Sequence, residues 1–195
     1  MIVTVDNCLP EKYIRDLEEI TYDLPMYYSM NTSYAPEDEK FDYWKDQLSK
    51  SNIVDNGQFT HAVYHKGDIC SKYYGLVYPI LYFFAEQAEV TVNKIVRIKI
   101  NLLLRDKTFT DENYNFPHSD RDGKYAFLYY INESDGDTVL FKEIDDLKTI
   151  PSTFNIQDRI TPARGRGLFF EGKRFHASCN PKVSQHRYVI NFNFD

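Results

Sequence analysis

Two neighbouring residues, His118 and Asp120, are of types that bind metal ions in proteins. They stand in the segment Phe-Pro-His-Ser-Asp, with a single residue between them. In an extended strand, residues i and i+2 project to the same side, so the imidazole and the carboxylate can reach one point. An isolated His-x-Asp pair is common by chance, however, and a lone histidine is more often a core or surface residue. The pair therefore predicts half of a metal site and needs a third ligand.

A candidate third ligand is His176, which follows Phe175 near the mouth of another predicted strand. It could approach His118 and Asp120 from across a barrel. Two histidines and one carboxylate on one face of a metal ion leave positions open, and this is the arrangement that non-haem Fe(II) uses. We therefore predict that His118, Asp120 and His176 form one metal site.

Arg187 begins an apolar strand and is a candidate anion-binding residue. Alternation along residues 187–192 places Arg187, Val189 and Asn191 on one side, so the guanidinium can point into the protein. A surface salt bridge is the usual role of an arginine. An inward arginine needs an anionic partner, and its planar donors suit a bidentate pair with a carboxylate.

The first half of the chain is expected to supply supporting elements. Residues 1–5 have the pattern of a short strand, and Pro10 begins a helix with an apolar residue at every third or fourth position. A second helical face begins at Asp68 and is kinked or split at Pro79. Residues 25–67 follow neither period, so we expect a long loop with minor structure.

From Lys94 onward the hydrophobic period changes from that of a helix to that of a strand. In this strand the apolar residues Val96, Ile98, Ile100, Leu102 and Leu104 alternate with the polar residues Arg97, Lys99, Asn101 and Arg105. Further strands are expected at residues 125–131, 138–141, 159–161, 167–170 and 187–194. Several short strands separated by Gly or Pro turns favour a sandwich or barrel.

Length and composition favour a single sheet-rich domain over residues 1–195. The chain is 43% hydrophobic, enough for one core, and it contains 16 tyrosines and 14 phenylalanines, which favour sheet. The 29 acidic residues outnumber the 23 basic ones, which disfavours duplex nucleic acid as a partner. One basic cluster is interpreted as solvated loop charge; it comprises Arg164, Arg166, Lys173 and Arg174.

The cysteines and the apolar runs bear on the cellular compartment. Cys8, Cys70 and Cys179 form no C-x-x-C pair, which fits a reducing compartment. The longest apolar run, residues 73–85, is broken by Pro79 and is too short to span a bilayer. The first residues lack the features of a secretion signal. We expect a soluble cytoplasmic protein, in the host cytoplasm if the source is viral, with no membrane partner.

Taken together, the His-x-Asp, His and Arg pattern resembles the Fe(II)- and 2-oxoglutarate-dependent dioxygenases, in particular their prolyl-4-hydroxylase-like branch. The resemblance extends from about Ile95 to the end of the chain. Residues 129–132 are similar to the family's Tyr-Tyr-Leu-Asn strand, and residues 136–141 to its Gly-Gly-Glu-Thr-x-Phe turn and strand. Asp135 stands where the family has the first glycine of that turn. Gln185 and His186 precede Arg187, where the family more often has a glycine nearby.

The resemblance implies a fold, a set of cofactors and a set of site residues. The implied fold is mainly β with supporting helices (α+β), a double-stranded β-helix of the jelly-roll, cupin-like type, with residues 1–93 supporting a core at 94–195. The implied cofactors are Fe(II), 2-oxoglutarate and O2, with the iron held by the three residues named above. Arg187 would bind 2-oxoglutarate with help from Tyr130 and Asn101. Tyr130 could equally be a core tyrosine, and Asn101 could equally point outward.

The implied reaction is hydroxylation of a C–H bond in a prolyl-type peptide or a polar small molecule, with release of succinate and CO2. The substrate is expected between the loops 25–67 and 106–116, in a pocket lined by residues such as Phe127, Phe169 and Tyr188. The alternatives are a metal-binding jelly-roll protein that does not use 2-oxoglutarate and a non-catalytic jelly-roll module. A nucleic-acid demethylase of the same superfamily is disfavoured by the acidic balance.

Overall fold

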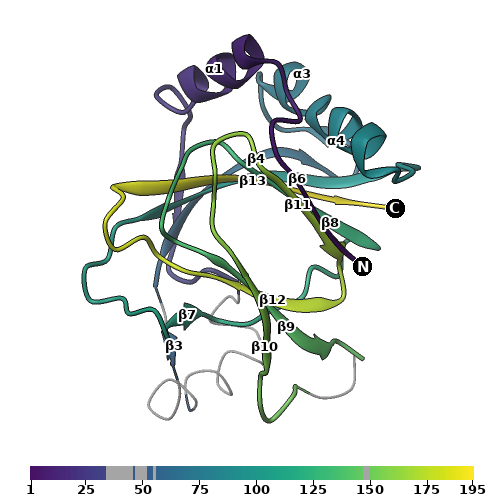
Figure 1. Cartoon of the computed structure of the whole chain (residues 1–195). Coiled ribbons are helices and arrows are strands. Elements are labelled where there is room, and N and C mark those ends of the chain that lie inside the picture. The colour runs from purple at the N-terminus through teal and green to yellow at the C-terminus, as the bar shows by residue number, and fades with distance from the viewer. Residues whose placement is uncertain (34–45, 47–51, 55, 147–149) are drawn as a thin grey trace.

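Two β-sheets that face each other form the body of the molecule (Figure 1). The computed structural model describes residues 1–33, 46, 52–54, 56–146 and 150–195. The large sheet has eight strands: β1 (Ile2–Val5), β11 (Gly167–Glu171), β8 (Tyr125–Tyr130), β13 (His186–Phe194), β6 (Ile95–Leu104), β4 (Gln58–His65) and β2 (Tyr27–Ser29) in this order, with β5 (Asp68–Ile69) paired to β4.

The second sheet has three strands, in the order β10 (Ile156–Ile160), β9 (Thr138–Ile144) and β12 (Arg174–Ser178). A separate parallel pair joins β3 (Ile53–Val54) to β7 (Tyr114–Asn115). The predicted jelly-roll class, mainly β with supporting helices, is confirmed, although the two sheets do not close into a barrel.

In the described part of the chain, three helices cover one side of the large sheet (Figure 1): α1 (Glu11–Ile20), α3 (Tyr74–Val77) and α4 (Ile80–Ala88). Leu17 of α1 and Phe84 of α4 are fully buried against strand residues such as Phe127 and Phe192. The rings of Phe84 and Phe127 stack with their centroids 4.0 Å apart. We call this covered side the outer face of the large sheet, and the side toward the three-stranded sheet the inner face.

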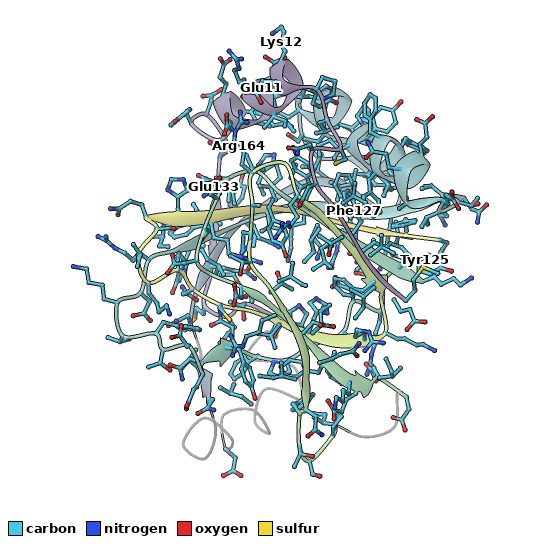
Figure 2. All side chains as sticks on the ribbon, in the orientation of Figure 1. Glu11, Lys12, Tyr125, Phe127, Glu133 and Arg164 are labelled. Carbon is cyan, nitrogen blue, oxygen red and sulfur yellow. The ribbon has the colours of Figure 1, made fainter. Side chains whose placement is uncertain are left out.

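A loop arginine ties α1 to the strands. Arg164 lies between β10 and β11, and its side chain points toward α1 (Figure 2). Its Nε donates to Glu18 at 2.6 Å and its Nη1 to Glu11 at 2.9 Å. Arg166 in the same loop donates to Asp6 at 2.6 Å. These two members of the basic cluster are paired within the chain, so the prediction that they are solvated loop charges was wrong.

The second predicted helical stretch is shorter than expected and is divided at Pro79. Residues 68–69 form β5, which pairs with β4 through the turn at Lys66 and Gly67. Both turn residues have positive φ, 48° for Lys66 and 107° for Gly67. Helix begins only at Tyr74, and Pro79 caps α4 because it has no N–H to continue the ladder from α3.

The expectation that residues 25–67 form a loop with only minor structure was wrong. They contain β2, β3 and the eight-residue strand β4, which pairs with β6 inside the large sheet. Much of the remainder, residues 34–45, 47–51 and 55, lies outside the described residues. Within the part of the chain that the structure describes, no helix has the length and apolar character needed to cross a bilayer.

Candidate active site

A cavity of about 310 Å³ lies against the inner face of the large sheet. Strand β13 contributes Arg187, Val189 and Asn191 to its wall, as the predicted alternation requires. The neighbouring strand β6 contributes Arg97, Lys99, Asn101 and Leu103, and the three-stranded sheet closes the opposite side with residues that include Thr138 and His176. The cavity is therefore polar, unlike the outer face.

The structure brings His118, Asp120 and His176 together at one wall of this cavity. Their ligand atoms all lie within 4.8 Å of one another. His118 is not in a named strand, but it pairs with His176 through two backbone hydrogen bonds of 2.9 and 2.8 Å. The backbone N–H of Asp120 donates to Gly172 at 2.8 Å. This pairing keeps residues 118–120 extended, so both side chains point to the same side, as the spacing predicted.

Each histidine is oriented by a hydrogen bond on its far ring nitrogen. Nδ1 of His118 lies 3.0 Å from the carbonyl oxygen of Phe116, and Nδ1 of His176 lies 3.1 Å from that of Arg174. A carbonyl only accepts, so each neutral ring carries its proton on Nδ1 and leaves the Nε2 lone pair free. Nε2 of His176 lies 3.8 Å from Asp120 Oδ2. Metal-binding histidines usually donate their other ring N–H to a carbonyl or carboxylate, as the two Nδ1 groups do here.

Asp120 is buried but well supplied with donors. Its Oδ2 accepts from the amide of Asn191 at 2.9 Å, and its Oδ1 accepts from Arg97 at 2.9 Å. Burial alone would raise the pKa of Asp120, but the positive charge of Arg97 and the hydrogen bond from Asn191 favour the ionised form and hold the pKa below the usual range. Arg97 also pairs with Asp122 at 3.3 Å. The carboxylate is therefore ionised and fixed in place.

Both imidazoles are held neutral by their surroundings. Burial is the main cause, and it lowers the pKa of His118 to about 3 and also lowers that of His176. Neutral imidazoles and an ionised carboxylate are the protonation states that metal coordination requires. The donor set therefore fits Fe(II) in both residue type and charge.

Arg187 lies in the same cavity and is only 4% exposed. Its Nη2 donates to Thr138 Oγ1 at 2.6 Å, while its Nε is buried without a hydrogen-bond partner. Burial lowers the pKa of this guanidinium because no ion pair with a carboxylate compensates it among the described residues. A buried, incompletely paired guanidinium is a receptor for an anion.

The other two predicted co-substrate residues lie beside the cavity in different ways. Tyr130 is fully buried; its hydroxyl donates to Thr138 Oγ1 at 2.7 Å, and its ring lies 5.5 Å from the Arg187 guanidinium. It contacts Arg187 but does not line the cavity wall. Asn101 does line the cavity, and its Oδ1 is buried without a partner. The outward position considered for Asn101 is wrong.

The sequence reasoning missed several cavity residues and misplaced others. Arg97 and Lys99 are in the wall, and their shared parity with Asn101 was the available signal. Asn191 lies on the side that its parity with Arg187 predicted, but no role was assigned to it. Phe127 and Phe169 are in the outer core under the helices, and Tyr188 packs against that core. None of these three lines the cavity, and neither does any residue of the fully described loop 106–116. From the predicted loop 25–67, Thr32, Ser33 and Gln58 do line it.

The comparisons with known proteins agree with this geometry. The model of the 2OG-Fe(II) oxygenase superfamily matches residues 107–195, the segment that contains all three candidate ligands and Arg187. Comparison with curated protein sequences gives no match.

Three solved structures of similar fold span nearly the whole chain. A 2OG-Fe(II) oxygenase family oxidoreductase from Burkholderia pseudomallei has a TM-score of 0.66 at 11% identity, covering 100% of this chain and 84% of its own. The epimerase SnoN of nogalamycin biosynthesis, described as non-haem and α-ketoglutarate dependent, has a TM-score of 0.56 at 8% identity, covering 98% of this chain and 76% of its own. A prolyl hydroxylase from Trichoplax adhaerens, bound to a hypoxia inducible factor peptide, has a TM-score of 0.54 at 14% identity, covering 99% and 82%.

Proposed function

Since this chain belongs to the 2OG-Fe(II) oxygenase superfamily, we propose that it hydroxylates a C–H bond of a prolyl-type peptide or a polar small molecule, with release of succinate and CO2. Enzymes of this superfamily require Fe(II), 2-oxoglutarate and O2. The family assignment therefore excludes the non-catalytic jelly-roll alternative. The roles of individual residues and the kind of substrate are the content of the proposal.

The proposed iron ligands are Nε2 of His118, Nε2 of His176 and a carboxylate oxygen of Asp120. Their support is the convergence within 4.8 Å together with the two Nδ1 hydrogen bonds that turn the free lone pairs inward. Asn191 and Arg97 hold the Asp120 carboxylate while leaving it further lone pairs for an ion. Bound Fe(II) would supply the activation of O2, which amino-acid side chains cannot provide.

The proposed co-substrate residue is Arg187, which would bind the distal carboxylate of 2-oxoglutarate. Thr138 and Tyr130 orient the guanidinium from below, so that its remaining donors are available to an anion. Asn101, with an unpartnered amide oxygen in the cavity wall, is proposed to contact the co-substrate or substrate. Tyr130 already donates to Thr138, so its proposed bond to the co-substrate carboxylate requires that hydroxyl to rotate.

One observation carries the proposal: a cavity that holds a metal-type cluster of three residues also holds a buried arginine that makes no ion pair with any described residue. A structural metal site would need only the cluster. The guanidinium adds a receptor for an organic dianion in the same cavity. This combination favours 2-oxoglutarate over metal chemistry that does not use it.

The observations support an oxygenase but do not distinguish a peptide substrate from a small molecule. The similar folds include one enzyme bound to a peptide and one from the biosynthesis of a small molecule, so both classes remain within the proposal. The volume of about 310 Å³ is at the low end for ligand cavities. It has to accept 2-oxoglutarate and only the reacting part of a substrate.

The test is succinate release from 2-oxoglutarate by the purified protein with Fe(II) and O2, in the presence of prolyl peptides and polar small molecules. His176→Ala serves as the blank, and mass spectrometry detects the added oxygen atom in the product. Arg187→Ala should abolish succinate release but retain metal binding. Succinate release that survives His176→Ala or Arg187→Ala would contradict the assigned roles.

A further inference from the structure

Lys99 is a cavity cation that the proposed chemistry does not use. It projects from β6 into the cavity wall together with Arg97 and Asn101. Arg97 is paired with Asp120 and Asp122, and Arg121 at the cavity rim is paired with Asp145. The Lys99 side chain makes no hydrogen bond or ion pair with any described residue. The arginines that line the cavity, Arg97, Arg121 and Arg187, each make at least one.

The strand register places Lys99 next to the proposed metal site. It stands directly opposite Asn191 of β13, the residue whose amide donates to Asp120. Cβ atoms of such pairs are about 4.5–5.5 Å apart. On its other side Lys99 is opposite Ala62 of β4, which is small and exposed. The register therefore places Lys99 between Asn191, which contacts Asp120, and a position that is exposed to solvent.

The charges of the loaded site leave Lys99 uncompensated. With Fe(II) and 2-oxoglutarate bound, the two positive charges of the metal and the one on Arg187 would be balanced by Asp120 and the two carboxylates of 2-oxoglutarate. Arg97 is balanced by Asp122. Burial already lowers the pKa of Lys99 to about 8, as expected for an ammonium group with little compensation. One further negative charge in the cavity would complete the balance.

Unpartnered polar atoms in the same cavity as Lys99 indicate that the missing partner is polar. The amide oxygens of Asn101 and Asn191 and the hydroxyls of Thr32 and Ser33 are buried and make no hydrogen bond to any residue that the structure describes, and all four residues line the cavity. Buried polar atoms are normally satisfied, so such a group marks a place for a ligand. The 2-oxoglutarate proposed at Arg187 would satisfy only part of this set.

We propose that Lys99 is a specificity-determining residue that binds an anionic group, a carboxylate or a phosphate, of a small polar substrate beside the metal site. The inference rests on the proposed function and narrows its substrate class. Electroneutral interior segments of a peptide lack the group that Lys99 would recognise. A small hydroxy acid or amino acid offers that group together with a hydroxyl or amino donor that suits the amide oxygens of Asn101 and Asn191.

The test uses binding of simple anions to the intact protein loaded with Fe(II) and 2-oxoglutarate under argon. The visible charge-transfer absorption of that complex is recorded while acetate, inorganic phosphate or the neutral analogue acetamide is added. Lys99→Met removes the charge at similar length, and Lys99→Arg keeps it. A charge-assisted hydrogen bond corresponds to a change of about tenfold or more in affinity.

The expected result is a saturable change with acetate or phosphate, none with acetamide, weakening of about tenfold or more in Lys99→Met and recovery in Lys99→Arg. Equal anion affinity in the wild type and Lys99→Met would overturn the inference, as would no saturable response to either anion. Loss of 2-oxoglutarate affinity in Lys99→Met as large as in Arg187→Met would assign Lys99 to the co-substrate instead. If the wild type gives no charge-transfer absorption, the proposed function itself fails.

Discussion

The two faces of the large sheet are built from the same strands but differ in what their side chains achieve. On β6, Ile98 and Ile100 are fully buried in the outer core, whereas Arg97 and Lys99 point into the cavity. The outer face is closed by stacked rings such as Phe84 and Phe127. On the inner face several buried polar atoms, among them the amide oxygens of Asn101 and Asn191, have no partner among the described residues, whereas the outer core has one such atom there, the Tyr129 hydroxyl. Since unpaired buried polar groups cost free energy, the comparison indicates that the outer face provides stability and the inner face provides ligand binding.

The largest effect is expected from loss of an inner-face histidine. His176→Ala should reduce Fe(II) binding and succinate release to background, because it removes one of three proposed ligands. The matched control is His61→Ala, which removes a buried histidine whose nitrogens contact Pro25 O at 2.9 Å and Ser71 Oγ at 2.7 Å. That change should lower the free energy of unfolding by about 1–3 kcal/mol but keep metal binding. Anaerobic Fe(II) titration measures the binding. Loss of the metal in His61→Ala and its retention in His176→Ala would contradict the assignment of ligand binding to the inner face.

The next effect concerns the outer face. Phe127→Ala should lower the free energy of unfolding by about 3–5 kcal/mol, because it leaves a cavity beside Phe84 and Phe192. Urea unfolding measures this change, and anaerobic titration of the folded variant should show unchanged Fe(II) affinity. A small loss of stability together with abolished metal binding would contradict the assignment of Phe127 to the stabilising outer face.

Arg187→Met should have the opposite effect to Phe127→Ala: it should weaken ligand binding without lowering the free energy of unfolding. We expect 2-oxoglutarate affinity to fall about a hundredfold, with unfolding free energy unchanged or raised, since a buried charge without an ion pair is removed. Arg166→Met is the matched control, because Arg166 pairs with Asp6 near the surface. Calorimetric titration of the Mn(II)-loaded proteins with 2-oxoglutarate gives the affinities. Equal affinities in the two variants would contradict the role of Arg187.

The smallest effect is expected at Asp135, a polar residue whose carboxylate is hydrogen-bonded within the protein. Like the residues of the outer face, it should therefore contribute to stability and not to ligand binding. Its carboxylate accepts from the backbone N–H groups of Lys182, Val183 and Ser184 at 2.9, 3.0 and 2.9 Å. Burial opposes ionisation, but these bonds lower the pKa of Asp135 to about 2. Allowing for its partial exposure, Asp135→Asn should cost about 1–2 kcal/mol of unfolding free energy.

The pH dependence of that contribution has a definite sign. The folded pKa of about 2 lies below the ordinary value of 3.8, so the unfolded chain takes up its proton first as the pH falls. The stabilisation is fully present above about pH 4 and is lost as the pH falls toward 2. Urea unfolding at about pH 6 and about pH 3 should show the difference between wild type and Asp135→Asn shrinking at the lower pH. A difference that grows on acidification would contradict this assignment.

The candidate site was predictable because its chemistry requires rare residue types in a fixed order. The spacing of His118 and Asp120 fixes their side in any extended segment, and the parity of Arg187 fixes its side on β13. These statements need no knowledge of the partner strands. In the folded protein, the backbone pairing of His118 with His176 brings these side chains together.

Two misplacements have physical causes that a single sequence does not reveal. Residues 126–130 of β8 are buried on both sides, so their alternation cannot tell the cavity side from the helix side, and Phe127 was placed wrongly. On β4, His61 occupies the outer face beside the apolar Val63, because its ring is satisfied by groups that only the fold brings near. Its polarity interrupted the period, and the strand was missed.

The most direct test of the central claim is a crystal structure of the protein with Mn(II) and 2-oxoglutarate, using anomalous diffraction to locate the metal. We expect one anomalous peak between Nε2 of His118, Nε2 of His176 and the Asp120 carboxylate, and a carboxylate of 2-oxoglutarate on Arg187. A metal bound elsewhere, or 2-oxoglutarate that leaves Arg187 uncontacted, would contradict the account.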